Sequence, residues 1–190
     1  MLGHVTRLTE RIDDTVVPRL EAVRRGLDSP ARTTRQAVVI GRLLGGVVIL
    51  VFLTGLWSHL LQEPPEWLPL PTRPSTLYQW TQGTHVLLGT VMLPLVLAKL
   101  WVVYPKLFEW PPVTSPVNGI ERLSVARLVS TSVLQPLIGL VNTYQWYPWP
   151  FPFRETHYAL AWVMVGALLV HLAVKLPLIV RHWRAGGGSR

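Results

Sequence analysis

Long apolar segments alternate with short polar ones along the chain. Three apolar segments, residues 37–61, 80–104 and 155–180, reach the length of about 20 residues that a helix needs to cross a bilayer core. The centre of the first one, LLGGVVILVFLTGLW, contains Thr54 as its only polar residue. This pattern predicts three membrane-spanning helices.

A fourth segment, residues 123–144, has a weaker pattern. Arg127 and Pro136 interrupt it, and its uncharged part, 128–141, is short for a membrane span. We nevertheless expect it to cross the membrane, because without it the last span would run in the opposite direction and would place the basic C-terminal residues outside. The sequence therefore predicts an all-α fold, a four-helix transmembrane bundle.

The positive charges indicate the orientation of the spans. Seven arginines precede the first span, whereas the connections 62–79 and 145–154 hold one arginine each, Arg73 and Arg154. Because Lys and Arg concentrate in cytoplasmic loops, we expect both termini to be cytoplasmic and these two connections to lie outside. Both connections are rich in Trp and Pro, which suits the headgroup level of a membrane.

Composition supports a membrane protein and divides the chain into three parts. Only 15% of the residues are charged, against about 25% in soluble domains. We expect a cytoplasmic amphipathic segment over 1–35, a membrane domain over 36–182 and a flexible tail over 183–190. The net charge of +8 follows from the basic cytoplasmic side, whose natural partner is anionic lipid, so nucleic-acid binding is not expected.

Histidines inside the spans are the main chemical signal. The chain has no cysteine, which excludes thiolate metal sites and covalently attached haem. His157 and His171 are 14 residues apart, which at 100° per residue places both rings on one helix face, separated by about 21 Å. Two other spans contain pairs with the same spacing: His85 with Lys99, and Gly41 with Gly55.

These pairs define two levels in the membrane. Gly55, His85 and His157 share the outer level. A flat macrocycle explains this set, because two imidazoles from antiparallel helices can clamp a haem iron while a glycine lets the porphyrin edge approach. Two imidazoles fill both axial positions, so such a haem b carries electrons and binds no substrate. The inner level consists of Gly41, Lys99 and His171.

Plainer roles remain open for each of these residues. A histidine in a span can simply hydrogen-bond a neighbouring helix, and a glycine can simply permit close packing. Lys99 ligates iron only when deprotonated, and otherwise extends to the interface. Arg42 and Arg154 can pair with haem carboxylates, and His59 can touch a haem carboxylate, touch a quinone headgroup or lie at the interface. A second haem at the inner level therefore stays an open hypothesis.

The arrangement resembles a known family. Four spans with His85 in the second and His157-x13-His171 in the fourth resemble bacterial membrane b-type cytochromes, the cytochrome b561 and formate dehydrogenase gamma-subunit group, over about residues 36–182. The resemblance implies a multi-pass protein of the bacterial inner membrane that relays electrons between the quinone pool and a partner oxidoreductase. The segments THVLLGTVMLPLVLAKLW, YPKLFEWPPV and WYPWPFPFRETHYALAWV resemble an actinobacterial branch, in which the partner is a periplasmic molybdopterin oxidoreductase.

One departure from the family concerns the inner level. In the family, a histidine near the inner end of the first span and the second histidine of the fourth span hold an inner haem, but here Arg42 stands at about the first position. The resemblance thus supports His85 and His157 as outer ligands, and His171 only as half of an inner site. We find no stand-alone catalytic site in the sequence. A haem-free membrane anchor that docks a partner protein is the alternative function.

Overall fold

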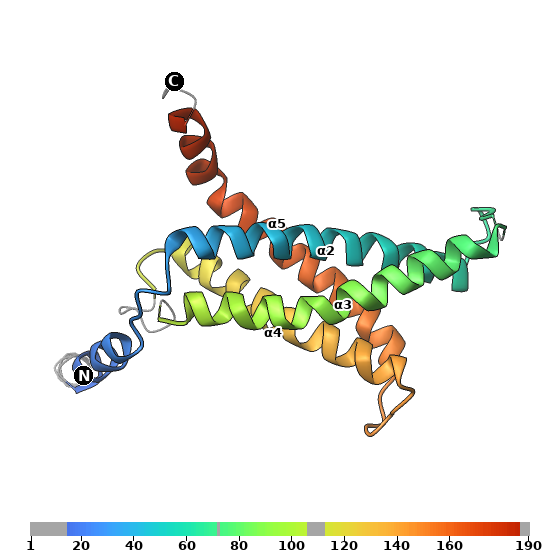
Figure 1. Cartoon of the computed structure of the whole chain (residues 1–190), viewed down its shortest axis with the longest axis horizontal. Helices are drawn as coiled ribbons and strands as arrows, with labels where there is room; N and C mark the ends of the chain where they lie inside the picture. The colour runs from blue at the N-terminus through green and yellow to red at the C-terminus, as the bar shows by residue number, and fades with distance from the viewer. Residues whose placement is uncertain (1–14, 72, 106–112, 187–190) are drawn as a thin grey trace, which may run out of the picture.

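The computed structural model describes residues 15–71, 73–105 and 113–186, with side chains up to residue 177. Its four long helices are α2 (Thr34–Gln62), α3 (Ser75–Val103), α4 (Pro116–Thr143) and α5 (Phe153–Gly186) (Figure 1). Each contains a segment long and apolar enough to cross a membrane. The predicted all-α, four-helix transmembrane architecture is therefore confirmed, and the chain is a multi-pass membrane protein.

Local sequence sets the start of two helices. The Thr33 hydroxyl accepts a hydrogen bond from the Gln36 backbone N–H, and the Gln36 side chain accepts one from the Thr33 backbone N–H, which together cap α2. Ser115 caps α4 by accepting from the Asn118 backbone N–H, and Pro116 occupies the first helical position. These signals place the helix starts before the apolar segments themselves begin.

Helix α4 continues through both Arg127 and Pro136. It has the lowest mean hydropathy of the four spans, 1.4, and the largest buried share of its apolar window, 28%. Polar side chains explain both values, because they face the neighbouring helices instead of lipid. The buried polar residues of α4 are Ser124, Thr131, Ser132 and Gln135.

The bundle consists of two helical hairpins. Helix α2 packs along α3, α4 packs along α5, and α3 joins the hairpins by packing against α4 (Figure 1). We call the end that holds the α2–α3 and α4–α5 connections the outer end, in keeping with the predicted orientation. Helices α3 and α5 both begin at this end and run in the same direction. The expectation that His85 and His157 lie on antiparallel helices is therefore wrong, because a single span, α4, lies between α3 and α5 and returns the chain to the outer end.

The core and the surface are both apolar, as a lipid environment requires. Val48, Met92, Val96 and Met164 form the buried cluster at the centre of the bundle. Large aliphatic side chains cover the outside, with exposed fractions above one half for Leu43, Ile49, Leu53, Leu87, Leu97 and Leu169. The tryptophans in or next to the two outer connections are also exposed: Trp67, Trp80, Trp146 and Trp149.

The structure describes the predicted N-terminal segment in part. Residues 15–26 form a helix, and most of its side chains are exposed. Residues 1–14 of the expected amphipathic segment lie outside the described residues, as do 187–190 of the expected tail. The cytoplasmic location of both termini stays a prediction.

Candidate functional site

All four helices line a cavity of about 170 Å³ in the outer half of the bundle. His85 from α3 and His157 from α5 both belong to its wall. Met92 and Met164 line the cavity and also belong to the buried core cluster, so the cavity lies directly against the core. Three glycines, one each from α2, α3 and α4, lie in the wall as well: Gly55, Gly89 and Gly139.

A backbone hydrogen bond fixes the ring of His85. Its Nδ1 lies 2.9 Å from the carbonyl oxygen of Val51 on α2. A carbonyl only accepts, so Nδ1 carries the hydrogen and donates it. The neutral ring then keeps its lone pair on Nε2. A hydrogen bond from one ring nitrogen to a backbone carbonyl is the usual support for a metal-binding histidine.

His157 lies next to His85 across the cavity. The two ring centres are 6.0 Å apart and the ring planes are nearly perpendicular, at 82°. Nδ1 of His157 is buried and has no hydrogen-bond partner among the described residues. The structure therefore brings together the two histidines that the spacing placed at one level.

Two glycines give these rings their space. A Cβ atom added at Gly55 would lie 2.6 Å from Cε1 of His85, and one at Gly139 would lie 3.2 Å from Cε1 of His157. Gly55 was expected at this level, whereas Gly139 was not foreseen from the sequence. Hairpin geometry could have found it, since Gly139 is four residues before the end of α4 and His157 four residues after the start of α5.

Two further polar groups of the cavity were not foreseen. Ser58 and Gln135 line it and are almost fully buried, with exposed fractions of 4% and 5%. The Ser58 hydroxyl and the Gln135 side-chain carbonyl have no hydrogen-bond partner within the described ranges. An unpaired buried polar group costs about 1–3 kcal/mol, so these two groups suit a ligand that offers them partners.

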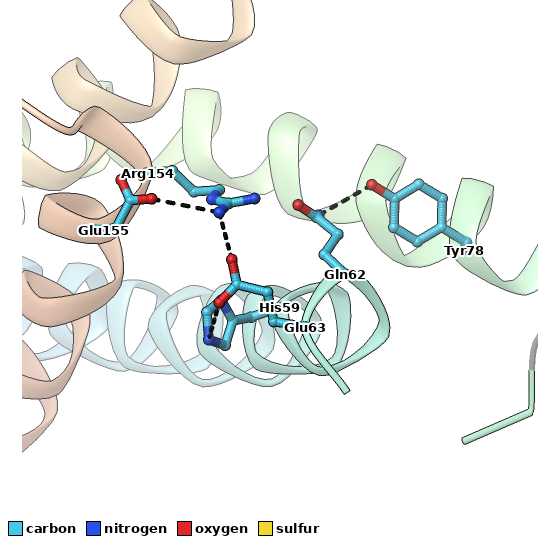
Figure 2. A network of polar contacts seen from close by, with 6 residues as sticks. All are labelled: His59, Gln62, Glu63, Tyr78, Arg154 and Glu155. Carbon is cyan, nitrogen blue, oxygen red and sulfur yellow. Dashed lines mark hydrogen bonds and ion pairs between the residues drawn. The ribbon is translucent and has the colours of Figure 1, made fainter. Parts of the chain in front are cut away.

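A polar network lies at the outer rim of the cavity (Figure 2). The Arg154 guanidinium pairs with Glu63 at the end of α2, and it also lies 3.4 Å from a carboxylate oxygen of Glu155. The ring of His59 stacks on Tyr158 of α5 with ring centres 3.8 Å apart, and its Nε2 is 3.9 Å from Glu63. These contacts, and the edge-to-face pair of Phe52 with Trp162, connect α2 to α5.

The inner level is built differently. Nζ of Lys99 donates a hydrogen bond of 2.6 Å to the Ala37 carbonyl, and a Cβ added at Gly41 would lie 3.2 Å from this Nζ. Gly41 and Lys99 thus lie at one level, as expected, but the Lys99 amine already donates its hydrogen bond to the α2 backbone. Arg42 is exposed on α2.

His171 lies beside charged groups of the inner level. Its Nδ1 is buried without a hydrogen-bond partner in the part of the chain that the structure describes. Three charged groups, Lys175, Glu121 and Lys99, lie near enough to this ring to interact with it electrostatically. Lys175 and Glu121 form an ion pair between α5 and α4, with 2.5 Å between Nζ and Oε1.

No protein-family model, curated protein or solved structure matches this chain. Among the described residues, no group of three or more His, Cys, Asp or Glu side chains could hold a metal ion.

Proposed function

We propose that this protein is a membrane electron-transfer subunit that binds one haem b between His85 and His157. One observation carries the proposal: two imidazoles from different helices meet inside a cavity of the membrane bundle, and the Val51 carbonyl holds one of them with Nε2 available for a metal. Haem iron has two axial positions, and imidazoles at both of them would supply one-electron chemistry without substrate binding.

The spacing of the rings fits this ligand set. A metal–imidazole bond of about 2 Å and a ring radius of about 1 Å on each side separate two ring centres by about 6 Å. The observed separation is 6.0 Å. An edge-to-face ring pair has a similar separation, so the distance supports the proposal only together with the Nδ1–H bond of His85 and the unpaired Nδ1 of His157.

The glycines support the proposal through shape. Gly55 and Gly139 leave each ring room against a neighbouring helix, and Gly89 faces open space. The first two glycines thus make room for the imidazole rings themselves, and the space at Gly89 is open to a planar cofactor beside the rings.

We propose one haem instead of two. The groups that share the inner level with His171 already serve protein contacts, since Lys99 donates to the Ala37 carbonyl and Lys175 pairs with Glu121. A single outer haem exchanges electrons near the outer end of the bundle. The resemblance of the sequence to membrane b-type cytochromes supports the quinone pool and a molybdopterin-type oxidoreductase as its two redox partners.

Spectroscopy of the purified protein tests the proposal. After expression with ample haem and reduction with dithionite, we expect sharp b-type alpha and Soret bands and one haem per chain by the pyridine haemochrome assay. His85→Ala and His157→Ala should each abolish the low-spin signal, because each removes an axial ligand. His171→Ala is the matched control, since it removes the same side chain from the inner level of α5.

Two results would contradict the proposal. Folded wild-type protein without a chromophore would instead favour a haem-free membrane anchor. An unchanged low-spin spectrum in either His85→Ala or His157→Ala would show that this residue is not a ligand. A loss of half the haem in His171→Ala would show a second haem at the inner level.

A further inference from the structure

Arg154 is the cationic residue of the cavity wall. Among the described residues that line the cavity, it carries the only permanent positive charge. It lies three residues before His157 on the first turn of α5, which places it about one helical turn outward of that ring. The buried, unpaired hydroxyl of Ser58 lines the same cavity.

Two carboxylates share this one guanidinium. Glu63 and Glu155 both lie beside Arg154, and the side chains of all three are half-exposed or more. Glu155 is its neighbour in sequence, whereas Glu63 comes from the end of α2 (Figure 2). The Glu63 contact is therefore the one that joins two helices.

Haem b has an apolar face and two carboxylates on one edge. A ligand of this kind between His85 and His157 needs a partner for that edge, and a guanidinium is well suited to bind a carboxylate through two parallel hydrogen bonds. Arg154 offers a charge, and Ser58 offers a buried hydroxyl that no other group of the described residues uses. The inner part of the cavity, at Met92 and Met164, offers apolar surface.

We infer that Arg154 is the carboxylate-binding residue of this site and that Glu63 competes with the ligand for it. This inference rests on the proposed haem site. Binding of a haem carboxylate exchanges the Glu63–Arg154 ion pair for a ligand–Arg154 pair. An exposed ion pair contributes little net stability, so the exchange is reversible and its balance depends on Glu63.

A titration of haem-depleted protein with two probes tests the inference. Hemin carries both carboxylates, whereas hemin dimethyl ester has the same ring and iron but carries neither. Binding in detergent is followed by the Soret band, which reports affinity and not activity. We expect Glu63→Gln to bind hemin about two- to fivefold more tightly than wild type, because an exposed carboxylate no longer competes for Arg154. Its affinity for the diester should stay at the wild-type value.

Arg154→Gln gives the opposite expectation. It should weaken hemin binding about threefold or more and should bring the affinities for hemin and the diester close together. Glu66→Gln is the matched control for Glu63→Gln, because it removes the same charge from an exposed position in the same connection. It should leave both affinities unchanged, which separates competition for Arg154 from a general effect of net charge.

The outcomes distinguish the inference from the proposed function. If wild type binds both probes and Glu63→Gln binds hemin no better than wild type does, the inference is wrong while the haem site stands. Equal changes for hemin and the diester, or for Glu63→Gln and Glu66→Gln, also overturn it. If wild type binds neither probe, the proposed function fails and the inference fails with it.

Discussion

At the scale of single residues, glycines decide how much room the cavity has. Helix α2 contains glycines in two kinds of surroundings. A Cβ at Gly55 would lie 2.6 Å from His85, whereas a Cβ at Gly45 or Gly46 would meet nothing within 4 Å. We therefore expect the same substitution to have opposite effects at positions between two and three helical turns apart.

We expect Gly55→Ala to destabilise the protein and Gly45→Ala to be neutral or stabilising. The first variant forces the His85 ring out of place and costs about 1–3 kcal/mol of unfolding free energy through overpacking. The second gains up to about 1 kcal/mol, because alanine is the better helix former. Gly139→Ala should lie between them, since its 3.2 Å approach to His157 needs a smaller shift.

Thermal unfolding in detergent checks this order, and haem content provides an independent measure. Gly55→Ala should also retain less haem than Gly45→Ala. If the three variants unfold at the same temperature and retain equal haem, the rings of His85 and His157 are not confined as the structure indicates.

At the scale of helices, α4 shows what a sequence can and cannot reveal. Its span was predicted from topology, and its hydropathy alone was a weak signal because its polar side chains face the other helices. Residue spacing predicted that Gly55 and His85 lie at the same level of the bundle. Gln135 and the Glu63–Arg154 ion pair were not predicted, because they depend on how the two hairpins pack together.

The ion pair between Lys175 and Glu121 connects α5 to α4 at the inner end. We expect Glu121→Gln and Lys175→Met each to destabilise the hairpin, because each leaves one charge without its partner near the membrane. The double variant should lose less than the sum of the single ones, with a coupling of about 0.5–3 kcal/mol. A double-mutant cycle on unfolding free energies measures this coupling. Additive losses would show that the two charges act independently.

At the scale of the whole molecule, the site faces one side of the membrane. The cavity lies in the half of the bundle next to the α2–α3 and α4–α5 connections, and Arg154 and His59 belong to its wall near that end. The helix at 15–26 and the start of α2 lie toward the other end (Figure 1). The side of the membrane on which this cavity lies therefore depends on the orientation of the bundle.

We expect the cavity to open toward the extracytoplasmic side, because arginines concentrate before the first span. Alkaline phosphatase, which is active only outside the cytoplasm, should be active when fused within residues 63–71 or 145–152 and inactive at the C-terminus. A cytoplasmic fluorescent reporter at the C-terminus is the complementary control. The reverse pattern would place Arg154 and the histidine pair on the cytoplasmic side, where a periplasmic oxidoreductase cannot reach them. Such a result would remove the proposed partner while leaving the haem site itself intact.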